Sequence, residues 1–221
     1  MSNTVATLQN LINEIQTNLP KEINEKEFGG RSSEVSKILN IRAGLLYRAY
    51  DLSNSALKII DDNLISGKLL ARGLFETGAV LAYLNLKIKK FIETKDLKEF
   101  NDKLTQMIVG SKIGEAPDSI SIITAVQSVE KQTDELEGFE NYFSTLCEFA
   151  HPNFLGVVGS FGKIEDTMTK YSLVPCNFEK QKQDTINALC FGIRVLTYFS
   201  LEIQDKMDEF IKVYNGVISE Q

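Results

Sequence analysis

Apolar side chains recur at three- and four-residue steps along most of the chain, which is the spacing of one face of an α-helix. The pattern predicts helices over residues 4–19, 33–59, 68–94, 95–109, 118–132, 134–150 and 177–218. The segment 68–94 is apolar on every face, so we expect it to lie at the centre of a helical bundle. The sequence therefore predicts an all-α fold, a helical bundle formed by one domain of residues 1–221.

Glycine-rich and polar segments divide this domain. We predict an N-terminal helix and linker over residues 1–30, a core bundle over 33–155, an irregular insertion over 156–176 and a long C-terminal helix over 177–218. Within the insertion, glycines alternate with short apolar runs and a proline follows, which is typical of turns and short strands. We therefore expect a small β-hairpin near residues 157–174.

The charge and the cysteine content restrict the class of protein. The net charge of −6 gives no broad attraction to nucleic acid or to anionic membranes, although it leaves room for a local basic site. The three cysteines lack a C-x-x-C spacing, which argues against a disulfide framework and against a zinc knuckle. We predict no metal ion and no other cofactor, and free thiols that suit a reducing cytoplasm.

The segment from Leu69 to Leu86 is the best candidate for a membrane span in the sequence. It contains Arg72 and Glu76, whose charges would be costly in the middle of a bilayer. The N-terminus has neither the basic nor the apolar region of a secretory signal. We therefore interpret this segment as a buried core helix and predict a cytoplasmic protein with no membrane partner.

Arg72 and Glu76 are the only charged residues between Leu69 and Leu86, and their spacing of four places them on one helix face. Buried ion pairs add little net stability, so their presence in an apolar helix suggests a role beyond stability. A structural ion pair that joins neighbouring helices is the alternative interpretation, and the sequence leaves both open.

His151 is the only histidine of the chain and stands at the end of a predicted helix, before Pro152. Histidine suits proton transfer near neutral pH, and the positive charge of an imidazolium is favoured at a helix C-terminus. The alternative is that His151 only caps the last carbonyls of the helix.

Two segments resemble a known family. The R-x-x-x-E helix between Leu69 and Leu84, and the later Tyr…His segment between Tyr142 and Asn153, resemble those of a bacterial family of helical proteins of unknown function. That family in turn resembles HEPN domains, which are dimeric helical bundles. Many HEPN proteins are metal-independent ribonucleases of toxin and antiphage systems.

The resemblance implies a site and a function. His151 would act as general acid or base, Arg72 would hold a phosphate, and Glu76 would orient Arg72. Tyr83 and Asn153 are expected to bind the ligand. We thus expect a homodimer that binds RNA or a nucleotide. The further expectation is that it cleaves RNA, as a metal-independent ribonuclease of a bacterial stress or antiphage system. The alternative is a non-enzymatic helical module that binds a protein partner, and the sequence leaves open whether the chain is an enzyme.

One departure from the HEPN ribonuclease signature is visible in the sequence. The signature has an arginine four to six residues before the histidine, whereas the matching positions here hold Ser144, Thr145 and Leu146. The site therefore requires Arg72 to face His151 across the bundle.

Overall fold

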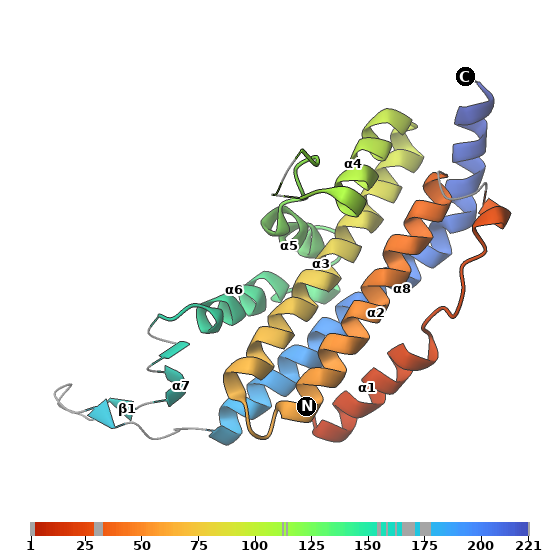
Figure 1. The fold of residues 1–221 in the computed structure, drawn as a ribbon. Helices are drawn as coiled ribbons and strands as arrows, with labels where there is room; N and C mark the ends of the chain where they lie inside the picture. The colour runs from red at the N-terminus through yellow and green to blue at the C-terminus, as the bar shows by residue number, and fades with distance from the viewer. Residues whose placement is uncertain are drawn as a thin grey trace.

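The computed structural model describes residues 3–28, 33–111, 113, 115–153, 156–157, 159–161, 163–164, 171–172 and 178–220. The predicted all-α helical bundle is confirmed (Figure 1). The helices are α1 (Val5–Thr17), α2 (Glu34–Ile59), α3 (Leu64–Thr94), α4 (Leu97–Val109), α5 (Ile122–Glu130), α6 (Phe139–Ala150), the short α7 (Gly159–Phe161) and α8 (Phe178–Ser219). Two short 3-10 helices, Glu25–Phe28 and Asp134–Leu136, precede α2 and α6.

Helix α3 lies at the centre of the bundle, as its apolar faces predict. It packs against α2, α4, α5, α6 and α8. Figure 1 shows α2, α3 and α8 side by side along the length of the molecule, with α3 and α8 running in the same direction and α2 running in the opposite one. Because α6 crosses the first half of α3, the site described below forms where α3, α6 and α8 meet.

Aromatic side chains fill the core at two levels. Near the end of α3, Phe91 packs against Phe100 of α4 and Phe210 of α8, with ring centroids 5.0 and 5.1 Å apart. Near its start, Phe75 stacks on Phe139 of α6 at 4.7 Å and meets Phe191 of α8 edge-on at 5.9 Å. The second cluster therefore fixes α6 against the two long helices.

The close packing of α3 and α8 depends on Gly192. A Cβ at this position would lie 3.1 Å from Leu74 Cγ and 3.2 Å from Phe75 Cδ2, which is closer than side chains normally approach. The absence of a side chain therefore lets the two helices approach closely beside the Phe75 cluster.

Some helix starts differ from the sequence predictions. Helix α2 begins at Glu34 after its cap Ser33, as expected, but α3 begins at Leu64, one turn before the expected residue 68. Helix α5, expected from residue 118, begins at Ile122 after its cap Ser121. The helix expected from residue 134 is preceded by a 3-10 turn over Asp134–Leu136, and α6 begins after Gly138, which has a φ of 90°. The expected first residue of the last helix, 177, lies outside the described residues.

In the region of the predicted hairpin, two strands of two residues each pair antiparallel. They are β1 (Lys163–Ile164) and β2 (Tyr171–Ser172). Residues 173 and 174, at the end of the predicted hairpin, lie outside the described residues.

Among the described helices, α8 alone is long and apolar enough to cross a membrane by length and composition. This differs from the candidate span predicted within α3. Most of the apolar window of α8, 61%, is buried inside the bundle, as in the core helix of a folded domain. The cytoplasmic location and the lack of a membrane partner remain predictions.

Candidate functional site

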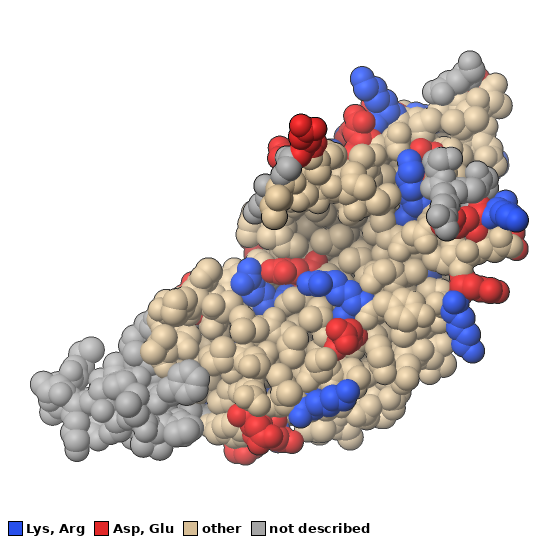
Figure 2. All heavy atoms as spheres, viewed as in Figure 1, with Lys and Arg blue, Asp and Glu red and all other residues tan. Residues whose placement is uncertain are grey.

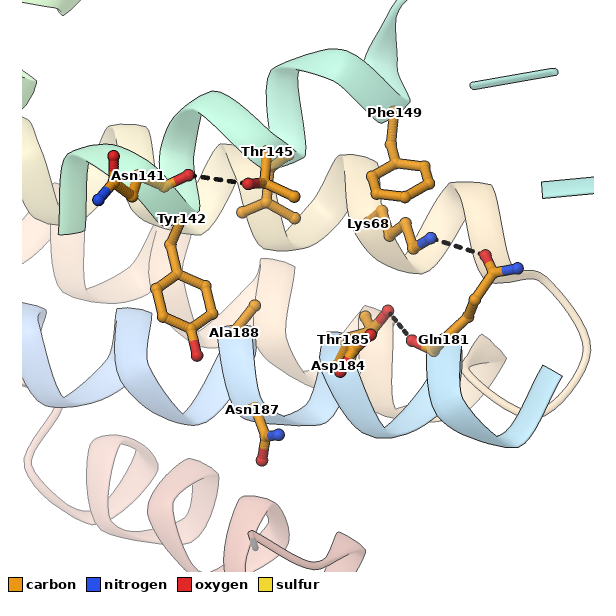
Figure 3. A pocket seen from close by; sticks show the side chains of 11 residues that line it. Lys68, Asn141, Tyr142, Thr145, Phe149, Gln181, Asp184, Thr185, Asn187 and Ala188 are labelled. Carbon is orange, nitrogen blue, oxygen red and sulfur yellow. Dashed lines mark hydrogen bonds between the residues drawn. The ribbon is translucent and has the colours of Figure 1, made fainter. Parts of the chain in front are cut away.

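A cavity of about 290 Å³ lies between α3, α6 and α8 (Figure 3). One face of α6 lines it through residues at three- and four-residue steps, and one face of α8 lines it opposite. Lys68 of α3 completes the lining. The lining residues are Lys68, Asn141, Tyr142, Thr145, Leu146, Phe149, Gln181, Asp184, Thr185, Asn187 and Ala188.

Lys68 is the one buried lysine in the described part of the chain, with 3% of its surface exposed. Its Nζ donates a hydrogen bond of 2.7 Å to Gln181 Oε1 and lies 3.2 Å from the centroid of the Phe149 ring. The Gln181 amide is oriented by a second bond, because its Nε2 donates to the carbonyl of Gly159. Figure 3 shows the ammonium between the two side chains, at one end of the cavity.

Burial lowers the pKa of Lys68 to about 8, and the charge of Asp184 acts in the opposite direction. No ion pair joins Lys68 to a carboxylate within the described residues, and its ammonium contacts a neutral amide and an aromatic ring. An ammonium has three donors, and the one hydrogen bond to Gln181 leaves donors for a ligand.

The other polar groups of the lining are mostly engaged elsewhere. The hydroxyls of Thr145 and Thr185 donate to carbonyls of their own helices, at 2.9 and 2.8 Å. The Asn187 amide accepts a hydrogen bond from the Asn3 side chain, and Figure 3 shows it pointing away from α6. Among the described residues that line the cavity, Lys68 and the exposed Asp184 are the two charged groups available to a ligand.

Arg72 and Glu76 form the ion pair predicted from their spacing, with Nη2 and Oε1 3.2 Å apart. Their side chains are 31% and 29% exposed, so the pair is half-buried. It lies against α6 beside Cys147, because Arg72 and Glu76 are both among the charges that act on this thiol. Burial raises the pKa of the Cys147 thiol, while the guanidinium of Arg72 opposes the rise.

His151 ends α6, as predicted, and its side chain is exposed. Its backbone N–H donates to the carbonyl of Cys147 at 3.3 Å. Within the described residues, no hydrogen bond or ion pair joins the imidazole to Arg72 or Glu76, although Arg72 of α3 lies beside Cys147, one turn before His151 on α6. The structure thus places Arg72 and Glu76 of α3 near the last turn of α6, which His151 ends, without a direct contact between them and the imidazole.

The two predicted ligand-binding residues lie apart from each other. Asn153 follows α6, where its Nδ2 donates to Glu148 Oε2 at 2.5 Å and its Oδ1 accepts from the backbone N–H of Gly156. Tyr83 lies on α3 eleven residues after Arg72, about 16 Å further along the helix. Its ring lies under Lys87, whose Nζ is 5.1 Å from the ring centroid. Burial, followed by the charge of Glu99, raises the pKa of Tyr83.

The lysines near the end of α3 do not form an isolated positive patch. Lys87 and Lys90 pair with Glu99 at 3.8 and 2.7 Å, and Lys89 pairs with Glu202 at 2.9 Å. Figure 2 shows Lys and Arg interspersed with Asp and Glu on the face drawn. The described residues contain no group of three or more His, Cys, Asp or Glu side chains placed to hold a metal ion.

Lys68 was not predicted from the sequence as a residue of the site. The helix was expected to begin at this residue, and a lysine at a helix start is normally exposed. Because α3 begins at Leu64, Lys68 lies inside the helix, four residues before Arg72. The sequence did contain one signal for a buried lysine, because Lys68 lies one turn before Arg72 on a helix that is apolar on every face.

Comparison with protein-family models, curated proteins and solved structures found no match for this chain. The resemblance to HEPN domains, and the homodimer that it implies, therefore remain predictions, and the site is interpreted from its own chemistry.

Proposed function

We propose that the protein binds a small organic molecule in the cavity between α3, α6 and α8. The observation that carries this proposal is a buried lysine with spare donors at one end of an otherwise mainly apolar cavity. Small-molecule sites are typically concave and apolar, with a few polar groups that orient the ligand.

The lining defines the class of ligand. The cavity is near the lower end of the size range of ligand sites, so the bound part of the ligand is small. The aromatic side chains Tyr142 and Phe149 favour an apolar or aromatic body. Lys68 favours an oxygen atom that accepts a hydrogen bond, such as that of a carboxylate, a carbonyl or a phosphate. A mononucleotide has both an aromatic base and phosphate oxygens, so the nucleotide predicted from the sequence belongs to this class of ligand.

Ligand binding is tested with two probes, benzoate and adenosine monophosphate. A probe present at ten times its Kd is expected to raise the melting temperature by roughly 3–6 °C, because binding to the native state alone stabilises it. Thr145→Phe places a large side chain at the exposed wall of the cavity and is expected to abolish the rise. The matched control is Ser144→Phe, at the neighbouring exposed position outside the lining. Equal shifts in the two variants would contradict the proposal.

A second candidate function is RNA cleavage at Arg72, Glu76 and His151. The observation that favours it is the contact of Arg72 with α6 at Cys147, one turn before His151. Under this proposal, Arg72 holds a phosphate and His151, exposed at the end of α6, transfers the proton.

The ribonuclease proposal predicts cleavage of single-stranded RNA by the pure protein in the presence of a metal chelator. His151→Ala is expected to lower the rate about a hundredfold, the usual scale for the loss of a general acid or base, with little change in melting temperature. Arg72→Ala is expected to lower the rate as well, at a stability cost of at most about 1 kcal/mol, because its ion pair is half-exposed. No cleavage by the wild-type protein would leave ligand binding and the protein–protein module as the alternatives.

A further inference from the structure

Lys68 differs from a lysine that is buried only to complete an ion pair. Its ammonium contacts a neutral amide oxygen and an aromatic ring, and its side chain lines a cavity. These partners hold an ammonium weakly compared with a carboxylate. They also accommodate a neutral amine, because neither carries a charge that deprotonation would leave unpaired. The surroundings of Lys68 therefore accommodate a neutral, reactive amine as well as an ammonium that only binds a ligand.

We propose that the Lys68 amine forms an imine with the aldehyde or ketone group of a small apolar ligand in this cavity. This inference rests on the proposed function and narrows its ligand class to carbonyl compounds. Lysine amines form such Schiff bases when a hydrophobic pocket keeps part of them neutral. The aromatic walls at Tyr142 and Phe149 provide the apolar surroundings for the body of the ligand.

The bond changes balance without a further reactant. The lone pair of Nζ attacks the carbonyl carbon, the C=O double bond opens, and one proton moves from nitrogen to oxygen to give a carbinolamine. Loss of the second proton from nitrogen, together with the hydroxyl, releases water and gives the C=N bond. In this proposal, the carboxylate of Asp184, which lines the same cavity and whose charge acts on Lys68, accepts the proton from nitrogen and returns it to the leaving hydroxyl.

The lowered pKa of Lys68 supports this chemistry. About a tenth of an amine with a pKa near 8 is neutral at pH 7, whereas for an ordinary lysine the neutral fraction is below about one in a thousand. The attacking species is thus roughly two- to threehundredfold more abundant at Lys68 than at an ordinary exposed lysine. Besides Lys68, the titratable groups that line the cavity are Asp184 and Tyr142.

The test uses benzaldehyde with sodium cyanoborohydride, which reduces an imine to a stable benzylamine. The full-length protein is treated at pH 7.5, and the labelled lysines are mapped by peptide mass spectrometry. Lys58 and Lys98 are the internal references, because both side chains are exposed. We expect Lys68 to be labelled at least about tenfold faster than these references, and benzoate to slow the labelling of Lys68 alone.

Variants at positions other than Lys68 distinguish labelling that requires the cavity from the general reactivity of lysines. Thr145→Phe is expected to suppress labelling of Lys68 while leaving Lys58 and Lys98 unchanged, and Ser144→Phe is expected to leave all three unchanged. Labelling of Lys68 no faster than that of the references would overturn the proposal. If benzoate raises the melting temperature but Lys68 is not labelled preferentially, the binding proposal stands and the imine proposal fails. If neither benzoate nor adenosine monophosphate raises the melting temperature and Lys68 is not labelled preferentially, both proposals fail.

Discussion

Replacement of Phe75 by alanine is expected to lower the free energy of unfolding by about 3–5 kcal/mol, the usual range for the loss of a buried aromatic ring. Phe75 is fully buried on α3, and its ring stacks on Phe139 of α6 and meets Phe191 of α8 edge-on. The variant loses both the apolar surface buried by the ring and the aromatic contacts that fix α6. Urea unfolding followed by circular dichroism measures the change.

The matched control for this variant is Leu201→Ala on α8, at a position where the side chain is 54% exposed. Its effect should stay within about 0.5 kcal/mol, as for an ordinary surface position. The same contacts shape the candidate site, because Tyr142 of the cavity wall lies 6.2 Å from the Phe75 ring. A loss of less than about 1 kcal/mol for Phe75→Ala would contradict the packing of α6 on α3 described above.

The helices could be predicted from the sequence where the apolar pattern is long and its ends carry a strong signal. The last helix was expected over residues 177–218 and is α8, Phe178–Ser219. Helix α6 ends at His151 because the following proline disfavours the helical conformation there. The start of α3 was missed because the polar turn after α2 obscured the first helical residues, and the start of α6 was missed because it depends on a positive φ at Gly138.

The candidate cavity could not be predicted in the same way. Its walls come from the first turns of α3, from α6 and from the start of α8, which are far apart in the sequence and meet only through packing. The sequence does predict the Arg72–Glu76 pair, because four residues correspond to about one helical turn. Lys68 has the same side chain as the exposed Lys58, and only tertiary structure distinguishes them. Local patterns therefore locate pairs on one helix, whereas sites shared by several helices require the fold.

Replacement of Lys68 by methionine is expected to raise the free energy of unfolding at pH 7, by about 1–3 kcal/mol. Burial lowers the pKa of Lys68 from 10.5 to about 8, so the folded protein holds a charge that the unfolded chain solvates better. A shift of this size corresponds to roughly 3 kcal/mol, since one unit is about 1.4 kcal/mol. The hydrogen bond from Lys68 to Gln181, which methionine cannot make, reduces the expected gain. A methionine of similar length fills the same space without a charge.

The pH dependence of this difference is the sharper test. Because the folded pKa lies below the unfolded value, the unfolded state binds more protons between pH 8 and 10.5, and the stability of the wild type rises with pH in this window. Below pH 8 the cost of the buried charge is fully present. The stability difference between Lys68→Met and the wild type should therefore be constant up to about pH 8 and shrink towards pH 10. Titrations of other groups cancel in this difference, and Lys58→Met, at an exposed position, should show no such trend. A difference that does not change with pH would show that the Lys68 amine is solvated in the folded protein, and the candidate cavity would then lack the buried lysine on which its proposed chemistry depends.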